Sequence, residues 1–102
     1  MRRARTLDEI IQSELKDEDS RNEYVRCAVE DFFENGDEIE LLLAIRQVAI
    51  AGEGLSVLSA KIGISEDVLG SILTGKEDIS LETFRKILSA LGFSLKLICN
   101  IQ

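Results

Sequence analysis

The sequence predicts a single all-α domain of 102 residues that ends in a short β-strand. Three observations predict this fold. Apolar residues recur at helical spacing through most of the chain, residues that cap helices precede each apolar run, and proline is absent. We divide the chain into an N-terminal arm with a short helix (1–19), core helices (20–51), two turn-linked helices with one further helix (55–92), and the strand (93–101).

Capping boxes predict where the first two helices begin. Residues 6–9 (TLDE) and 20–23 (SRNE) each place a hydroxyl residue three positions before a glutamate, which satisfies free N–H groups at a helix start. The second helix runs to about Glu34, because Asn35 and Gly36 tolerate the left-handed backbone that ends helices. The positions expected to face the core are Leu7, Ile10, Ile11, Leu15, Tyr24, Val25, Ala28, Val29 and Phe32.

Residues 38–51 predict the central helix of the core. Asp37 stands where it can cap this helix, and Glu40 follows three residues later. The helix is apolar around most of its circumference, as expected of a helix with neighbours on several sides. Its apolar residues are Ile39, Leu41, Leu42, Leu43, Ile45, Val48 and Ile50.

Residues 56–74 predict a helix-turn-helix, with the turn at residues 63–65. Gly63 takes positive φ without Cβ strain, and Ser59 is small enough to lie where two helices cross. A second helix held in this way lies in the DNA major groove in helix-turn-helix proteins. The apolar residues expected to fill the wedge between the helices are Leu58, Ile62, Ile64, Leu69 and Ile72.

A further helix and a strand complete the expected fold. Ser80 caps the helix and Gly92 ends it. Its inward positions are expected to be Leu81, Phe84, Ile87, Leu88 and Leu91.

Residues 93–101 alternate between apolar and other side chains, which is the period of a strand. A lone strand exposes unpaired backbone groups. It therefore either pairs with a second copy through Phe93, Leu95 and Leu97, adds to the sheet of another protein, or packs on its own helices.

The net charge of −7 is unevenly distributed. Residues 1–51 carry 7 basic and 13 acidic side chains, whereas residues 52–102 carry 5 and 6. Such an acidic chain lacks the positive field that drives non-specific DNA binding. The acidic half either attracts a basic protein partner or is simply a solvated surface.

The sequence gives no sign of catalytic or metal chemistry. Histidine is absent, so His-based triads and His zinc sites are excluded, and no cofactor is expected. Two lone cysteines, Cys27 and Cys99, indicate a reducing compartment and small core side chains. No apolar run approaches the roughly 20 residues that span a bilayer, and no signal peptide is recognisable. We expect a cytoplasmic protein that is not an enzyme.

Two parts of the chain carry a resemblance to known proteins. The segment 56–92 resembles the Xre-type, lambda-repressor-like helix-turn-helix family. The upstream segments 23–37 and 45–49 look like a narrower group, the probable addiction-module antidote proteins, which are HigA-like antitoxins. The residues that carry the first likeness are Leu58, Ser59, Gly63, Ile64, Ser65, Leu69, Ile72, Gly75, residues 80–84, Lys86, Ile87, Leu88 and residues 90–92. The likeness extends from about Leu15 to Leu97.

The resemblance implies an antitoxin. Such proteins are cytoplasmic, usually homodimeric, and silence a small basic toxin of the RelE/HigB class that cleaves messenger RNA. They also repress their own operon by binding its operator. Two rival functions are a transcriptional regulator without a toxin, and a protein-interaction module that has lost DNA binding.

The expected recognition helix departs from the family pattern, because it contains no Arg, Lys, Asn or Gln. Glu66 and Asp67 either accept hydrogen bonds from cytosine or simply suit the helix dipole. Gly70 either permits a close backbone approach or has no such role. Arg2, Arg3 and Arg5 either enter a minor groove or are a disordered start. The candidate DNA-binding residues are Ser56, Lys61, Ser65, Glu66, Asp67, Ser71, Thr74 and Lys76. Ser65 is also expected to be the N-cap of this helix.

Overall fold

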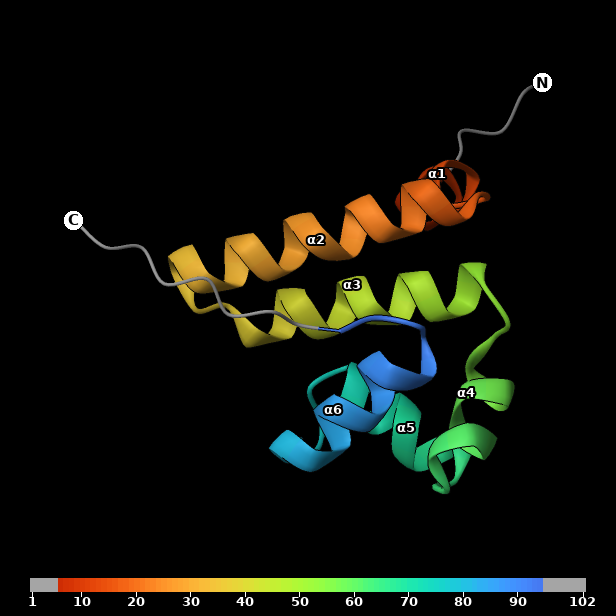
Figure 1. The fold of residues 1–102 in the computed structure, drawn as a ribbon, viewed down its shortest axis with the longest axis vertical. Helices are drawn as coiled ribbons and strands as arrows, with labels where there is room; N and C mark the ends of the chain where they lie inside the picture. The colour runs from red at the N-terminus through yellow and green to blue at the C-terminus, as the bar shows by residue number, and fades with distance from the viewer. Residues whose placement is uncertain (1–5, 95–102) are drawn as a thin grey trace.

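A computed structural model describes residues 6–94, which form six α-helices and no β-strand (Figure 1). The chain is all-α over this range, as the helical spacing predicts. The helices are α1 (Leu7–Glu14), α2 (Glu18–Asn35), α3 (Glu38–Ala51), α4 (Leu55–Ile62), α5 (Glu66–Leu73) and α6 (Leu81–Ala90).

The helix α3 lies at the centre of the arrangement (Figure 1). The long helix α2 packs along one side of it, and α1 packs against its C-terminal half near Gln47. The three short helices α4, α5 and α6 lie on the opposite side of α3 from α2 (Figure 1). The central position expected for residues 38–51 is therefore confirmed.

The buried core joins α3 to the three short helices. Ile45, Leu69, Leu73 and Ile87 are completely enclosed, and they come from three different helices. Burying one such side chain contributes on the order of 2 kcal/mol. The position of the helix-turn-helix is thus fixed by its packing on α3 and α6 rather than by its turn alone.

Side-chain caps begin five of the six described helices. Thr6, Asp37, Ser65 and Ser80 each accept a hydrogen bond from the backbone N–H three residues later, as the sequence predicts.

The predicted start of α2 is wrong by several residues. Asp17, not Ser20, is the N-cap, and its carboxylate accepts a hydrogen bond from the Ser20 N–H at 2.7 Å. The Arg21 guanidinium also donates to the Leu15 and Lys16 carbonyl oxygens, at 2.9 and 3.0 Å. These contacts satisfy free groups at the junction of α1 and α2, so the helix begins earlier than its capping-box pattern indicates.

Several side chains expected in the core are exposed instead. Leu81, the first residue of α6, is 87% exposed. On α3, Ile39, Leu43 and Ile50 are 55%, 42% and 38% exposed, so the helix keeps an apolar strip facing solvent. Cys27 is also exposed rather than a core residue, and Cys99 lies outside the described residues.

The C-terminal strand expected over residues 93–101 is not found. Its described beginning, Phe93 and Ser94, has no strand structure, and the remainder lies outside the described residues. Gly92 has φ +89°, and the N–H groups of Gly92 and Phe93 donate to the Ser89 and Leu88 carbonyl oxygens at 3.0 and 2.9 Å. This pair of bonds is the Schellman ending of a helix.

Phe93 packs on both buried clusters of its own chain. Phe93 therefore does not begin a strand, and its side chain packs on its own helices, while a role of Phe93 in dimerisation stays a prediction. Leu95 and Leu97, the other residues expected at that contact, lie outside the described residues.

Candidate nucleic-acid interface

The turn between α4 and α5 has the geometry that the sequence predicts. Gly63 has φ +79°, and its N–H donates to the Ser59 carbonyl oxygen at 2.9 Å. The Ile64 N–H donates to the same oxygen at 3.2 Å. A residue with a Cβ is strained at this φ even though space is open around it. The glycine therefore ends α4 and lets the chain reverse into α5 within three residues.

Small and apolar side chains fill the contact between the two helices. Ser59 is only 6% exposed, and its hydroxyl donates to the Ser56 carbonyl oxygen at 2.8 Å. Its polar group is thus satisfied inside its own helix, while its small size lets α5 approach. Leu58, Leu69 and Ile72 are buried as expected, while Ile62 and Ile64 are partly buried against the same core.

Ser65 and two acidic residues form the start of α5. The Ser65 hydroxyl oxygen accepts a hydrogen bond from the Val68 N–H at 3.1 Å, so its capping role is confirmed. Glu66 and Asp67 lie in the first turn and are exposed. Their charge suits the helix dipole there. The same charge opposes any phosphate that approaches this end of α5.

The remaining candidate DNA-binding residues differ in how exposed they are and in whether their polar groups already have hydrogen bonds. Ser56 and Lys76 are exposed, and Ser71 is partly buried. The Thr74 hydroxyl donates to the Gly70 carbonyl oxygen at 2.9 Å, so its proton is already used within the helix. Together with Glu66 and Asp67, these residues belong to α4, α5 and the loop after α5.

Gly70 has no steric reason to be a glycine in the isolated protein. It lies inside α5, is not among the glycines with positive φ, and a Cβ there meets no atom within 4 Å. An alanine would therefore fit. The two alternatives for Gly70, a close backbone approach and no such role, both stay predictions.

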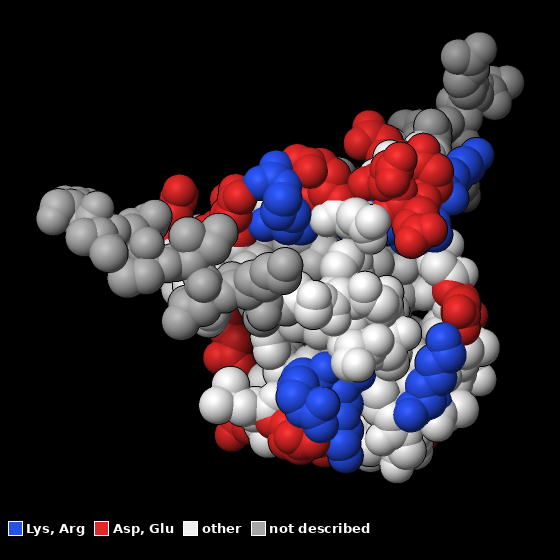
Figure 2. Space-filling view, viewed as in Figure 1, with Lys and Arg blue, Asp and Glu red and all other residues white. Residues whose placement is uncertain are grey.

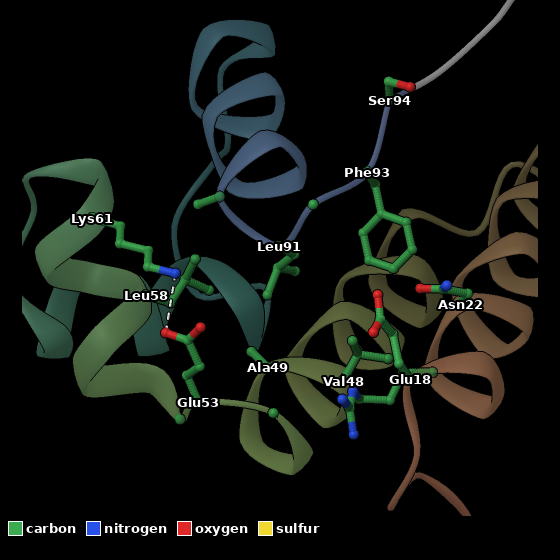
Figure 3. A pocket seen from close by; sticks show the side chains of 15 residues that line it. Glu18, Asn22, Val48, Ala49, Glu53, Leu58, Lys61, Leu91, Phe93 and Ser94 are labelled. Carbon is green, nitrogen blue, oxygen red and sulfur yellow. Dashed lines mark ion pairs between the residues drawn. The ribbon is translucent and has the colours of Figure 1, made fainter.

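Lys61 differs from the candidate DNA-binding residues on α5, because its side chain is paired with Glu53. Its ammonium nitrogen pairs with Glu53 Oε2 at 3.0 Å, at one side of a cleft of about 550 Å³ (Figure 3). On its other side Lys61 lines a groove between α4 and α6 together with Arg85 and Lys86. The role of Lys61 in DNA binding stays a prediction, and its charge is partly offset by Glu53.

The basic residues Arg85 and Lys86 are not among the DNA-binding candidates predicted from the sequence. Figure 2 shows basic side chains gathered over α4 and α6, whereas acidic side chains dominate along α1 and α2. An outward-facing Arg-Lys pair next to Ile87 on α6 was the available signal. Arg85 is itself paired with Glu82, and that contact lowers the pKa of the Glu82 carboxyl below its ordinary value.

No group of three or more metal-ligating side chains occurs among residues 6–94. Within the same range no single helix is long and apolar enough to cross a membrane, and α3 with α4 reaches that length only as a pair bent by 107°.

The comparisons with known proteins identify a family. The model of a family described as "Probable addiction module antidote protein" matches residues 7–99. This range includes all six helices and nearly the whole chain, so the protein belongs to that family. No curated protein and no solved structure matches the chain. Family membership gives the protein an antidote, or antitoxin, role and implies a cognate toxin as its partner.

Proposed function

We propose that this antidote-family protein is the antitoxin of a type II toxin–antitoxin module, binds a small basic RNase toxin, and represses its own operon through operator DNA. It acts in the cytoplasm, as a homodimer, and by stoichiometric binding rather than catalysis. The observation that supports this most is the family match over residues 7–99, combined with a helix-turn-helix inside that range.

The DNA-binding part of the proposal rests on α4 and α5. The helix α4 begins at Gly54 without a side-chain cap, which leaves N–H groups of its first turn available to a phosphate. Ser56 lies in that turn, and the outer face of α5 carries exposed side chains. In a dimer, two copies of α5 enter major grooves about one turn of DNA apart.

The toxin-binding part of the proposal rests on the negative charge of α1 and α2 and on their separation from the helix-turn-helix. The helices α1 and α2 lie outside the helix-turn-helix, and acidic side chains dominate over them (Figure 2). Opposite charge steers a basic partner to such a surface and speeds association. Toxin and DNA then bind to different parts of the same chain.

Co-expression with the small protein encoded by the adjacent reading frame tests the antitoxin role. We expect that the neighbour alone arrests growth and degrades messenger RNA, and that this chain restores growth and forms a complex of fixed stoichiometry. A Ser71→Asp variant, altered on α5, is expected to restore growth equally. Persistent arrest with no complex formed would refute the antitoxin role.

A second candidate function is a protein-interaction module that no longer binds DNA. The exposed acids Glu66 and Asp67 on α5 favour it, because they face the side where phosphates would approach. A regulator without a toxin is less favoured, since the family is one of antidotes. Binding to the protein's own upstream DNA distinguishes the first proposal from the interaction module, and formation of a complex with a toxin distinguishes it from the regulator.

A further inference from the structure

The helices α1, α2 and α3 enclose a groove of about 480 Å³ on the part of the molecule that the helix-turn-helix does not use. Its lining is mainly apolar and includes Ile11, Tyr24, Ala28, Phe32 and Leu43. These side chains come from all three helices, so the shape of the groove depends on their packing. The contact between α1 and α3 is fixed by Gln12, whose amide donates to the Gln47 side-chain oxygen at 2.6 Å.

The groove remains apolar where it meets solvent. Leu43, on the α3 side, is 42% exposed, and Leu7, on the α1 side, is 71% exposed. Both leucines therefore still expose apolar surface that a partner can bury. A partner that covers both leucines therefore gains from removing them from water.

Carboxylates surround this apolar lining. Asp8, Asp31, Asp37 and Glu40 line the groove, against a single cation, Arg46. Asp8 and Asp37 accept hydrogen bonds from the Gln47 side chain and the Glu40 N–H, at 3.1 Å each. Within residues 6–94, no hydrogen bond or ion pair reaches the carboxylates of Asp31 and Glu40, so both are free to meet a cation.

We infer that this groove is a docking site for a basic amphipathic helix of a partner protein. The apolar face of the helix covers Leu7, Leu43 and the lining between them, while its Lys or Arg side chains meet Asp31 and Glu40. Helix-in-groove recognition uses apolar anchors at i, i+3, i+4 and i+7, with flanking charge setting orientation. Nucleic acid is disfavoured here, because its phosphates meet four carboxylates.

This inference deepens the proposed function, and it rests on that function for the identity of the partner as the toxin. The groove itself can be probed without the toxin. The chain has one tyrosine and no tryptophan, so its intrinsic fluorescence reports Tyr24 in the groove. Cys27 also lines the groove and is exposed, so its alkylation rate reports whether the groove is covered.

The test uses the full chain with Cys99→Ser, so that Cys27 is the sole thiol. The probe is a synthetic helix of about 15 residues with Leu at the anchor spacing, Lys elsewhere, and no aromatic or Cys residue. We expect it to change Tyr24 fluorescence and slow Cys27 alkylation by about tenfold, with a matched Glu-for-Lys helix doing neither.

Variants locate the binding. Leu43→Asp, and separately Asp31→Lys with Glu40→Lys, are expected to weaken probe binding about tenfold, with the fold of each checked by circular dichroism. Leu81→Asp, at an exposed leucine on α6, is the matched control and leaves binding unchanged.

Three results would overturn the inference. These are equal protection of Cys27 by the acidic helix, undiminished binding to Leu43→Asp, or protection of Cys27 without probe as protein concentration rises, which assigns the groove to a second copy. None of these three results changes whether the chain restores growth in the co-expression test. The groove can therefore be refuted as a docking site while the antitoxin role stands, and the reverse.

Discussion

The Gly63 N–H donates a hydrogen bond to the Ser59 carbonyl oxygen at 2.9 Å, and this bond ends α4 where the turn into α5 begins. The side chain of Ser59 is also buried, at the contact between α4 and α5. One residue therefore serves as both the end of the first helix and the spacer that lets the second approach. The orientation of α5 depends on this pair.

Two glycine substitutions test the geometry of the turn and of α5, because they are expected to change the free energy of unfolding in opposite directions. Gly63→Ala is expected to lower the free energy of unfolding by about 1 kcal/mol, because alanine is strained at φ +79°. Gly70→Ala is expected to raise it by up to about 1 kcal/mol, because the site is helical and open. Urea unfolding followed by circular dichroism measures both. Similar changes of the same sign would contradict the description of the turn.

The acids at the start of α5 are expected to have opposite effects on folding and on DNA. Replacing both, as Glu66→Gln with Asp67→Asn, removes a favourable interaction with the helix dipole that is worth about 0.3–1 kcal/mol for each. The same change is expected to tighten DNA binding by about threefold to tenfold at low salt, because it removes charge that repels phosphates.

Glu30→Gln with Glu34→Gln on α2 is the matched control for that change, since it removes two exposed carboxylates outside the helix-turn-helix. We expect it to leave DNA affinity unchanged at about 0.15 M salt, where distant charges are screened. If the α5 variant instead loses affinity for the operator, the acids are base-reading residues and the dipole explanation is wrong.

The free energy of unfolding is expected to fall at acid pH, because Asp17, the N-cap of α2, becomes protonated. Hydrogen bonds from the Ser20 side chain and the Ser20 N–H lower the pKa of Asp17 below its ordinary value of 3.8. A carboxyl group with a lowered pKa in the folded state stabilises the fold above 3.8, and that contribution is lost as pH falls through the lowered value. Thermal unfolding across this pH range measures the loss.

Asp17→Asn keeps a capping oxygen and removes the titrating group. Its unfolding temperature should depend less on pH below 3.8 than that of the unaltered chain. Identical pH dependence in the two proteins would mean that Asp17 does not contribute in this way.

Phe93 is expected to act within its own chain. Phe93→Ala removes a partly buried side chain that packs on both buried clusters, so it should lower the free energy of unfolding by about 2 kcal/mol. Ser94→Ala, at the exposed neighbour, should change stability little. A Phe93 variant that unfolds at the same urea concentration as the unaltered chain would contradict this packing.

Local signals in the sequence predicted most of the helices. Thr6, Asp37, Ser65 and Ser80 each act on a backbone N–H three residues away, so a short pattern is enough to locate them. The start of α2 was mispredicted because two candidate caps lie three residues apart, and the contacts of Arg21 with the preceding carbonyl groups help to select the earlier one.

Longer-range features were harder to predict. The alternating pattern after Gly92 is compatible with a strand, yet the Schellman bonds to Ser89 and Leu88 direct Phe93 onto the core. Leu81 fits the apolar spacing of α6 but is exposed at the first residue of that helix. The groove between α1, α2 and α3 was not predicted either, because it depends on the packing of three helices rather than on any single pattern.

A mobility-shift titration of the protein's own upstream DNA, at 0.05 and 0.15 M salt and with or without the toxin, tests the central claim most directly. We expect a sequence-specific complex that is weak for the protein alone, because the chain carries a net charge of −7, and that a basic toxin tightens and makes more salt-dependent. The absence of a shift in every condition would contradict the claim that α4 and α5 bind an operator.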